Sequence, residues 1–128
     1  MSLTVSSDLL EKAQRGPVDN ADFIACIKDS LPYAWEVISE VAQKARASES
    51  GFDANEVPPP GEQERGQLLR LVGSDAMRAA VEQHFGMRLA FQNCHKVALF
   101  TPEAGAAHAE FVTPRAQLLN QSPELVDC

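Results

Sequence analysis

The chain has 128 residues, of which 45% are hydrophobic and 23% are charged, so we expect one core and a single domain over residues 1–128. Its formal net charge of −7 makes binding to nucleic acid or to an anionic membrane surface unfavourable. The sequence has no signal-peptide pattern and no apolar run long enough to span a membrane, which predicts a cytoplasmic protein.

Two short helices are predicted at the start of the chain. The first begins near Ser7 or Asp8 and ends at Gly16-Pro17, because glycine permits a left-handed cap and proline cannot continue a helix. The second helix spans residues 21–30 with Asp19 as its N-cap. Both helices are expected to pack beside a longer third one.

The third helix, residues 31–47, has the strongest apolar periodicity in the chain, and Ser30 is its expected N-cap. Glu36 lies among large apolar residues in this pattern. It either occupies the edge of the apolar stripe or is a partly desolvated carboxylate of the kind that acts as a general base. Glu36 is therefore a candidate catalytic residue.

Residues 48–64 combine serine, glycine, three prolines and five acidic residues, which predicts an exposed loop with an extended polyproline centre. A loop of this length in a small domain is often functional. It could cover a cleft or contact a second subunit, or it could simply connect the helices on either side.

Two further short helices follow from about Gly66, the second capped by Ser74 and closed by Gly86. The apolar period then changes from 3.6 to 2 in residues 87–92 and 96–100, which predicts two strands. A weaker third strand is predicted from His108 to Val112. Thr113-Pro114 then begins a final short helix, and residues 121–128 form a polar surface tail.

These elements indicate an α+β fold: a mainly helical single domain of about five to six helices with a small two- or three-stranded antiparallel sheet near the C-terminus. So small a sheet leaves edges to cover, which makes a homodimer plausible. The expected core consists of large apolar residues of the third helix, the two middle helices and the strands. These residues are Tyr33, Trp35, Ile38, Leu68, Leu69, Val81, Phe85, Leu89, Phe91, Val97 and Leu99.

Asn93, Cys94 and His95 lie at the junction of the two predicted strands. Asparagine tolerates left-handed dihedral angles, so a hairpin turn accounts for Asn93. Adjacent strand residues point to opposite faces, so a nucleophilic Cys94 would need His84 or His108 as its base. A buried structural thiol is the alternative for Cys94. His95 is the second candidate catalytic residue, because imidazole transfers protons near neutral pH.

No metal and no cofactor are expected, because C-x-x-C pairs, H-E-x-x-H and glycine-rich phosphate loops are absent from the sequence. A serine hydrolase is disfavoured because there is no G-x-S-x-G motif. Cys26, Cys94 and Cys128 are odd in number and widely spaced, which favours free thiols in a reducing compartment.

Basic residues are concentrated between residues 65 and 96, a stretch that contains five basic but only two acidic residues. Arginine recognises carboxylates with two parallel hydrogen bonds, so Arg70 or Arg88 could hold a substrate carboxylate beside Glu36 or His95. Trp35 and Asn93 complete the expected substrate-binding set. The alternative is a set of scattered, solvated arginines.

The segments LPYAWEVI (31–38), RGQLLRLVGSDAMR (65–78), LAFQNCHKVALF (89–100) and QLLNQSPELVDC (117–128) resemble a family of small actinobacterial conserved proteins of unassigned function. In size and acidity the chain is also similar to the enzymes that form lysinoalanine bridges in cinnamycin-type lanthipeptides. The second resemblance implies a reaction in which a lysine amine adds to a dehydroalanine.

We therefore expect an accessory or tailoring protein of a bacterial biosynthetic pathway that binds a peptide or small-molecule substrate between the third helix and the sheet. If it is catalytic, Glu36 or His95 would accept the proton of an attacking amine in an addition or cyclisation. The alternative is a non-catalytic, dimeric interaction or regulatory protein.

Overall fold

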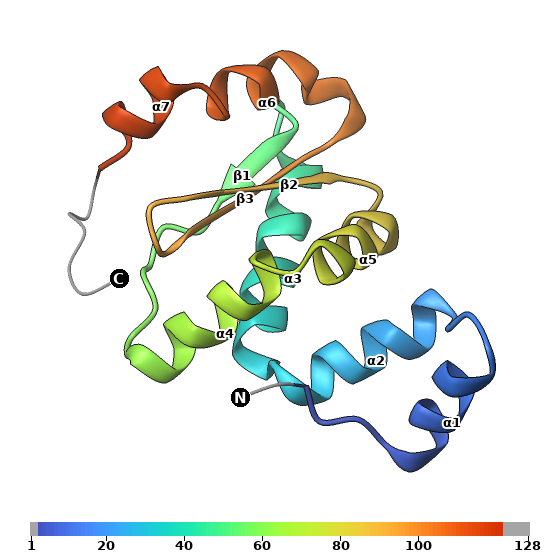
Figure 1. Ribbon diagram of the computed structural model, residues 1–128. Helices are drawn as coiled ribbons and strands as arrows, with labels where there is room; N and C mark the ends of the chain where they lie inside the picture. Colours follow the sequence, from blue (N-terminus) through green and yellow to red (C-terminus); the bar gives the residue numbers. More distant parts are fainter. Residues whose placement is uncertain (1–2, 122–128) are drawn as a thin grey trace.

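The computed structural model describes residues 3–121 and shows an α+β fold in which helices cover both faces of a small antiparallel sheet (Figure 1). The helices are α1 (Ser7–Arg15), α2 (Asn20–Ser30), α3 (Pro32–Ala47), α4 (Glu62–Val72), α5 (Asp75–Phe85), the 3-10 turn η1 (Pro102–Ala104), α6 (Gly105–Phe111) and α7 (Pro114–Leu119). The strands are β1 (Phe52–Ala54), β2 (Arg88–Gln92) and β3 (Lys96–Phe100). The expected fold class is confirmed, with seven α-helices in the described part of the chain.

The sheet has the order β1-β3-β2, and both neighbouring pairs are antiparallel. β3 is therefore central, while β1 and β2 are both edge strands. The hairpin of β2 and β3 lies where the sequence predicts it, with Leu89 opposite Leu99 and Phe91 opposite Val97.

Each face of the sheet belongs to a different apolar cluster. Leu89, Val97 and Leu99 point toward the main core, which they share with α2, α3, α4 and α5. Ala90, Ala98 and Phe100 point to the opposite face, where α6 covers them. In Figure 1 this arrangement is seen as α6 and α7 above the sheet and α3, α4 and α5 below it.

The predicted third strand is wrong. Residues 105–111 form α6 instead, because three of the seven residues are alanine, the best helix former, and one helix face packs on Phe100. The third strand is β1, which lies inside the segment 48–64 predicted as a loop. In the same segment Pro59 is buried, and α4 begins at Glu62 rather than near Gly66.

Several helix ends are those that the sequence predicts. Ser74 caps α5 by accepting a hydrogen bond from the Met77 N–H, and Gly86 ends it with φ 67° in the left-handed region. Ser30, however, does not cap α3. It is the last residue of α2, and Gln67 of α4 instead accepts hydrogen bonds from the N–H groups of Tyr33 and Ala34.

Most of the expected core is confirmed. Ile38, Leu68, Val81, Leu89, Val97 and Leu99 are buried, and Tyr33, Trp35, Phe85 and Phe91 pack against them half-buried. Leu69 is wrong, since its side chain is 41% exposed and Leu71 is buried in its place. Leu68 and Leu71 are three residues apart and lie on the same, buried face of α4, whereas Leu69 points to a different side of the helix.

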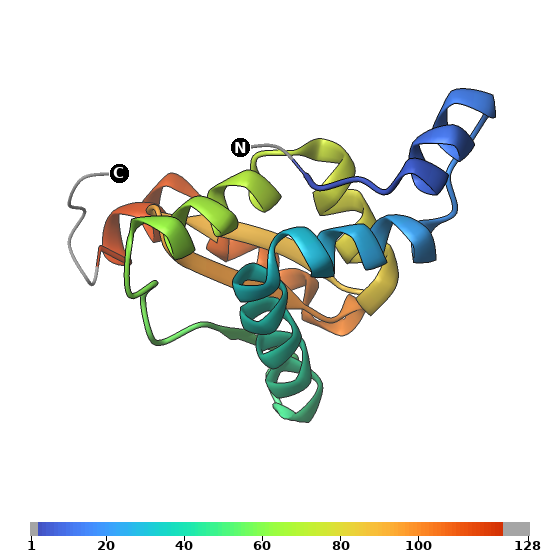
Figure 2. The ribbon, with the colours of Figure 1, turned by 90° about the horizontal axis from the view of Figure 1, so that it is seen from below.

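Helix α1 stands apart from the rest of the molecule. It has no buried residue, and Figure 2 shows it extending away from the body beyond α2. None of the helices within residues 3–121 is long and apolar enough to cross a membrane.

Candidate functional site

A groove of about 420 Å³ lies between α3 and the segment that begins with β1. We call it the α3–β1 groove. Its acidic lining consists of Glu36 and Glu40 from α3 and of Asp53 and Glu56 from the opposite wall. The remaining lining residues are Tyr33, Val37, Val41, Lys44, Ala54, Asn55, Val57, Pro58 and Pro60. The groove thus combines an acidic rim with a largely apolar floor.

The helical repeat of α3 produces one wall of this groove. Glu36, Glu40 and Lys44 are four residues apart and therefore lie in one row along the helix. Val37 and Val41 lie one position further round, where they form the floor beside the buried face. The same pattern that buries α3 therefore presents its carboxylates to the groove.

Asn55 fixes the opposite wall. Its side-chain Oδ1 accepts a hydrogen bond from the N–H of Val97 at 2.7 Å, and its Nδ2 donates to the carbonyl oxygen of His95 at 2.9 Å. Its own N–H donates to the carbonyl oxygen of Val97 at 3.1 Å. Asn55 therefore extends the pairing of β1 with β3 by one residue and holds the start of the segment that forms the wall.

The electrostatics of the groove favour a cation. The ammonium group of Lys44 lies 3.1 Å from the Glu40 carboxylate, and this hydrogen bond and charge raise the pKa of Lys44. Asp53 and Glu56, on the opposite wall, raise the same pKa further. Carboxylates of both walls thus act together on one ammonium group.

The pKa of Tyr33 also responds to nearby carboxylates. Tyr33 lies beyond Glu36, at the opposite end of the row from Lys44. Partial burial raises the pKa of its phenol first, and the charges of Glu64 and Glu36 add to this effect. Negative charge near the hydroxyl disfavours the phenolate, so Tyr33 stays a neutral hydrogen-bond donor at the mouth of the groove.

Among five cavities of residues 3–121, none is lined by both expected catalytic residues. Glu36 is exposed and lines the α3–β1 groove, a position that agrees with the edge of the apolar stripe. His95 is buried in the turn between β2 and β3 and lines none of these cavities.

The two expected arginines also lie apart. Arg88 is exposed and lines a separate cavity with Glu82 and His108. Arg70, on α4, is half-buried, and its NH1 nitrogen has no hydrogen-bond partner among the described residues. Neither arginine lines the α3–β1 groove.

Trp35 serves to pack helices together. Its ring stacks on Phe85 with centroids 5.4 Å apart and meets the edge of His84 at 5.3 Å, while the Lys28 ammonium group lies over it at 5.0 Å. These contacts join α2, α3 and α5. They account for the half-buried position of Trp35 without a ligand.

Asn93 belongs to a network of side-chain amides that ties α7 to the hairpin. Its φ of 59° confirms the left-handed turn predicted for it. Its Nδ2 donates to the carbonyl oxygen of Asn120, and its Oδ1 accepts from Gln117 Nε2 at 2.7 Å. Gln92, which is buried, donates to the carbonyl oxygen of Phe111 and accepts from Asn120 Nδ2. The amide of Asn93 is therefore engaged within the fold.

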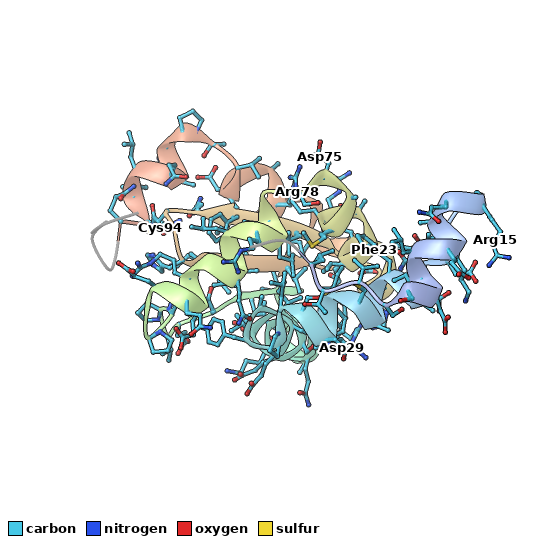
Figure 3. All side chains as sticks on the ribbon, turned by 60° about the horizontal axis from the view of Figure 1, so that its bottom comes forward. Arg15, Phe23, Asp29, Asp75, Arg78 and Cys94 are labelled. Carbon is cyan, nitrogen blue, oxygen red and sulfur yellow. The ribbon has the colours of Figure 1, made fainter. Side chains whose placement is uncertain are left out.

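The expectation of free thiols holds for Cys26 and is wrong for Cys94. Cys26 is free and buried, and its Sγ donates to the carbonyl oxygen of Thr4 at 3.3 Å. Cys94 is buried, as one of its alternatives predicts, but it is disulfide-bonded. A disulfide-bonded sulfur carries no thiol, so it is not a nucleophile of the expected kind. Figure 3 shows Cys94 at the end of the molecule remote from Arg15 of α1. Cys128 lies outside the described residues.

The residues of the described part of the chain form no cluster of histidine, cysteine, aspartate and glutamate that could hold a metal ion. Asn55 is the important site residue that the sequence does not reveal. Its only local signal is an asparagine beside a three-residue strand, and its hydrogen bonds reach across 40 and 42 positions.

Comparison with known proteins gives one family. A family model labelled KH NucS shadow and described as "NucS shadow ORF" matches residues 1–128. No curated protein and no solved structure matches the chain. The chain belongs to the NucS shadow ORF family.

Proposed function

We propose that this protein binds a basic segment of a peptide or protein partner in the α3–β1 groove. The observation that supports the proposal is the convergence of carboxylates from both walls on the Lys44 ammonium group. A lysine or arginine of a ligand would experience the same field. The ligand is thus a peptide, as the sequence suggests, with positive charge.

The shape of the groove suits a long basic side chain. Lysine and arginine bury their aliphatic stems on apolar surface while the charged group stays near water. Val37 and Val41 offer that surface, and Glu36 and Asp53 lie on opposite walls beside it. Because Glu36, Glu40 and Glu56 are exposed and Asp53 is only half-buried, each ion pair with a ligand would contribute only about 0.2–1 kcal/mol, and several pairs are needed for appreciable affinity.

We propose binding rather than catalysis as the primary function. Of the six residues expected to act on a substrate, Glu36 alone lines the groove. The amine addition that the lanthipeptide resemblance implies would use Glu36 to accept a proton from a bound lysine. Conversion of a bound peptide into a product of changed mass or connectivity would support that reaction.

Nucleic acid is the alternative ligand that the family label raises. KH names a nucleic-acid-binding module whose GXXG loop clamps the nucleotide backbone. In this chain a short loop that begins with Gly73 joins α4 and α5 and can be compared with that loop. Residues 73–76 read Gly-Ser-Asp-Ala, so the second glycine is missing, and the carboxylate of Asp75, at the start of α5, is exposed. With the net charge of −7, this loop favours a peptide ligand.

The expected cytoplasmic location stays a prediction. The disulfide at Cys94 favours an oxidising compartment instead, because cytoplasmic thiols are usually kept reduced.

Fluorescence anisotropy with a labelled peptide of alternating lysine and leucine tests the proposal. We expect Glu36→Gln and Asp53→Asn each to weaken binding by roughly 1.5- to 5-fold, and the double variant by more. Rising salt should weaken binding to the original protein more steeply than binding to the double variant, because fewer ion pairs remain to be screened.

Glu103→Gln is the matched control, because Glu103 is an exposed carboxylate outside the groove, on η1. It should leave the affinity unchanged. A peptide of alternating glutamate and leucine and a labelled single-stranded oligonucleotide should both fail to bind in the groove. Unchanged affinity of the double variant for the lysine peptide would overturn the proposal, and tight binding of the oligonucleotide would favour the KH-like alternative.

A further inference from the structure

We propose a second peptide site on the opposite edge of the sheet, where β2 binds an extended acidic segment by strand addition. This site goes beyond the proposed function, since it uses another strand, the opposite charge and the main chain rather than side chains alone. Its position follows from the direction of the backbone groups of β2.

The hydrogen bonds that β3 makes on its β1 side show which backbone groups of β2 point out of the sheet. The N–H and C=O of Val97 both bond to Asn55, so they point toward β1 and away from β2. Val97 is paired with Phe91. Where two opposite residues of antiparallel strands do not hydrogen-bond to each other, each directs its N–H and C=O away from the other strand. The N–H and C=O of Phe91 therefore point out of the sheet, and within residues 3–121 neither has a hydrogen-bond partner.

Leu89 confirms this direction and marks one end of the open edge. Its N–H donates to the Glu82 carboxylate at 2.9 Å, which is possible only if it points away from β3. Glu82 therefore occupies the edge at Leu89, and the unpaired stretch runs from the carbonyl of Leu89 to Phe91.

A cavity of about 530 Å³ lies along this edge. We call it the β2 groove. Its wall on the side of the main core includes Val72 and Arg78, and its other wall includes His108, Phe111 and Val112. The remaining lining residues are Leu89, Ala90, Phe91, Gln92, Thr113, Pro114 and Gln117. The groove is thus a strand edge flanked by a helix on each side.

The charge of the β2 groove is opposite to that of the α3–β1 groove. Arg78 and His108 are the ionisable residues of its described lining, which includes no carboxylate. Arg78 pairs with Asp75, and Figure 3 shows the two side by side on α5. The Asp75 side chain is 94% exposed, so the carboxylate of a ligand can replace it at the guanidinium group with little loss.

These features define the chemistry of the occupant. Side chains of an extended peptide alternate between the two faces of the sheet that it joins. Residues on one side would meet Arg78, which suits glutamate or aspartate. Residues on the other side would meet Phe111 and the exposed Val112, which suits an apolar side chain. The ligand is therefore an extended segment in which acidic and apolar residues alternate.

The flanking helices also limit what can bind. A free strand edge can pair with the edge of another sheet, and proteins prevent this by covering or shortening such edges. Here α5 and α6 flank the edge and Glu82 occupies one end, so a single extended chain fits more easily than the sheet of a second molecule.

The probe is an acetylated and amidated peptide of alternating glutamate and valine, titrated into isotopically labelled protein. We expect the Phe91 amide to shift in the NMR spectrum and its hydrogen exchange to slow on binding. Arg78→Gln should weaken binding roughly 1.5- to 5-fold, because one exposed ion pair with the peptide is lost. Arg115→Gln is the matched control, since Arg115 is exposed, pairs with Glu110 and does not line the groove.

N-methylation of the peptide distinguishes strand addition from simple charge attraction. One N-methyl group on the edge that faces Phe91 should reduce the affinity several-fold, and the same group on the other edge should have little effect. The Glu36→Gln, Asp53→Asn double variant should bind this peptide normally, which separates this proposal from the α3–β1 groove.

Three results would overturn the proposal. One is binding without any change in Phe91 exchange, and another is equal affinity of Arg78→Gln and the original protein. The third is slow Phe91 exchange in the absence of peptide together with a dimeric mass, because the edge would then pair with a second copy of the chain.

Discussion

Asn93 has two separate roles in the hairpin turn, and two substitutions distinguish them. Its φ of 59° is a conformation that glycine adopts freely and alanine does not, while its amide bonds to Asn120 and Gln117 of the α7 region. We expect Asn93→Gly to lose the amide bonds alone, at a cost of about 1 kcal/mol, and Asn93→Ala to lose roughly 1 kcal/mol more. Urea unfolding of both variants measures the difference, and equal stabilities would contradict the backbone role.

Tyr33 is the single tyrosine of the chain, so its ionisation can be followed by phenolate absorbance without ambiguity. Burial and then the charges of Glu64 and Glu36 raise its pKa above the usual value near 10. We expect Glu64→Gln and Glu36→Gln each to lower this pKa. A titration in which neither variant differs from the original protein would contradict the proximity of these charges to Tyr33.

The same shift in the Tyr33 pKa sets a pH dependence of stability. Because the folded pKa is the higher one, the unfolded chain loses the phenol proton first as pH rises above about 10. In that window the folded state binds more protons, so its stability falls with increasing pH. Tyr33→Phe should show a smaller fall over the same range, measured as the denaturation midpoint against pH.

Single residues that act on the backbone close to them in the sequence were predictable. Ser74 as a helix cap, Gly86 as a helix end and Asn93 as a turn residue each depend on local conformation. Asn55 was not predictable, because its role depends on Val97 and His95 far along the chain. The disulfide of Cys94 was also not predicted, because disulfide pairing depends on which cysteines lie close together in three dimensions.

The connection of β1 to the central strand depends on Asn55, and this gives a prediction for a whole element. Asn55→Ala would leave the buried N–H of Val97 without its acceptor, which costs about 1–3 kcal/mol. The substitution would also remove the hydrogen bond from Asn55 Nδ2 to the carbonyl oxygen of His95. We expect lower stability and faster hydrogen exchange at Val97. Asn55→Asp keeps an acceptor for Val97 and should recover part of the loss, and an equal loss in both variants would contradict this account.

Short elements were harder to predict than long ones. β1 has three residues, and Phe52 and Ala54 alternate with one aspartate, which is too short a pattern to recognise. A strand was predicted from His108 to Val112, but the three alanines of residues 105–111 favour the helix α6. The error has structural meaning, because α6 covers Ala90, Ala98 and Phe100, a face of the sheet that a third strand would have left open.

At the scale of the whole molecule, the two edges of one sheet carry opposite charge. The β1 edge adjoins the carboxylates of the α3–β1 groove, and the β2 edge adjoins Arg78 and His108. The central strand separates them, so both grooves can be occupied at once. The basic residues that the sequence concentrates between 65 and 96 therefore do not form one surface in the fold. Of the four arginines in this stretch, only Arg78 lines the β2 groove.

The N-terminal region should be separable from this arrangement. α1 has no buried residue, and the main core is formed by α2 to α5 and the sheet. Before α1, Leu3 packs against the core and Thr4 bonds to Ser30 and Cys26. We expect a chain that lacks residues 1–16 to unfold cooperatively, with stability reduced by about 1–3 kcal/mol for the lost hydrogen bonds and apolar contact.

Cys26 provides the specific readout of this truncation. Its thiol is free and 8% exposed, and the residues removed include Thr4, which accepts its hydrogen bond, and Leu9, which lines the same cavity. The truncated chain should therefore react faster with a thiol reagent, and Cys26→Ser in the truncated chain should abolish the added reactivity. Binding of the lysine peptide and the glutamate-valine peptide should be unchanged, because neither groove includes residues before Tyr33. Loss of either binding activity would mean that the N-terminal region shapes a groove that lies outside its direct contacts.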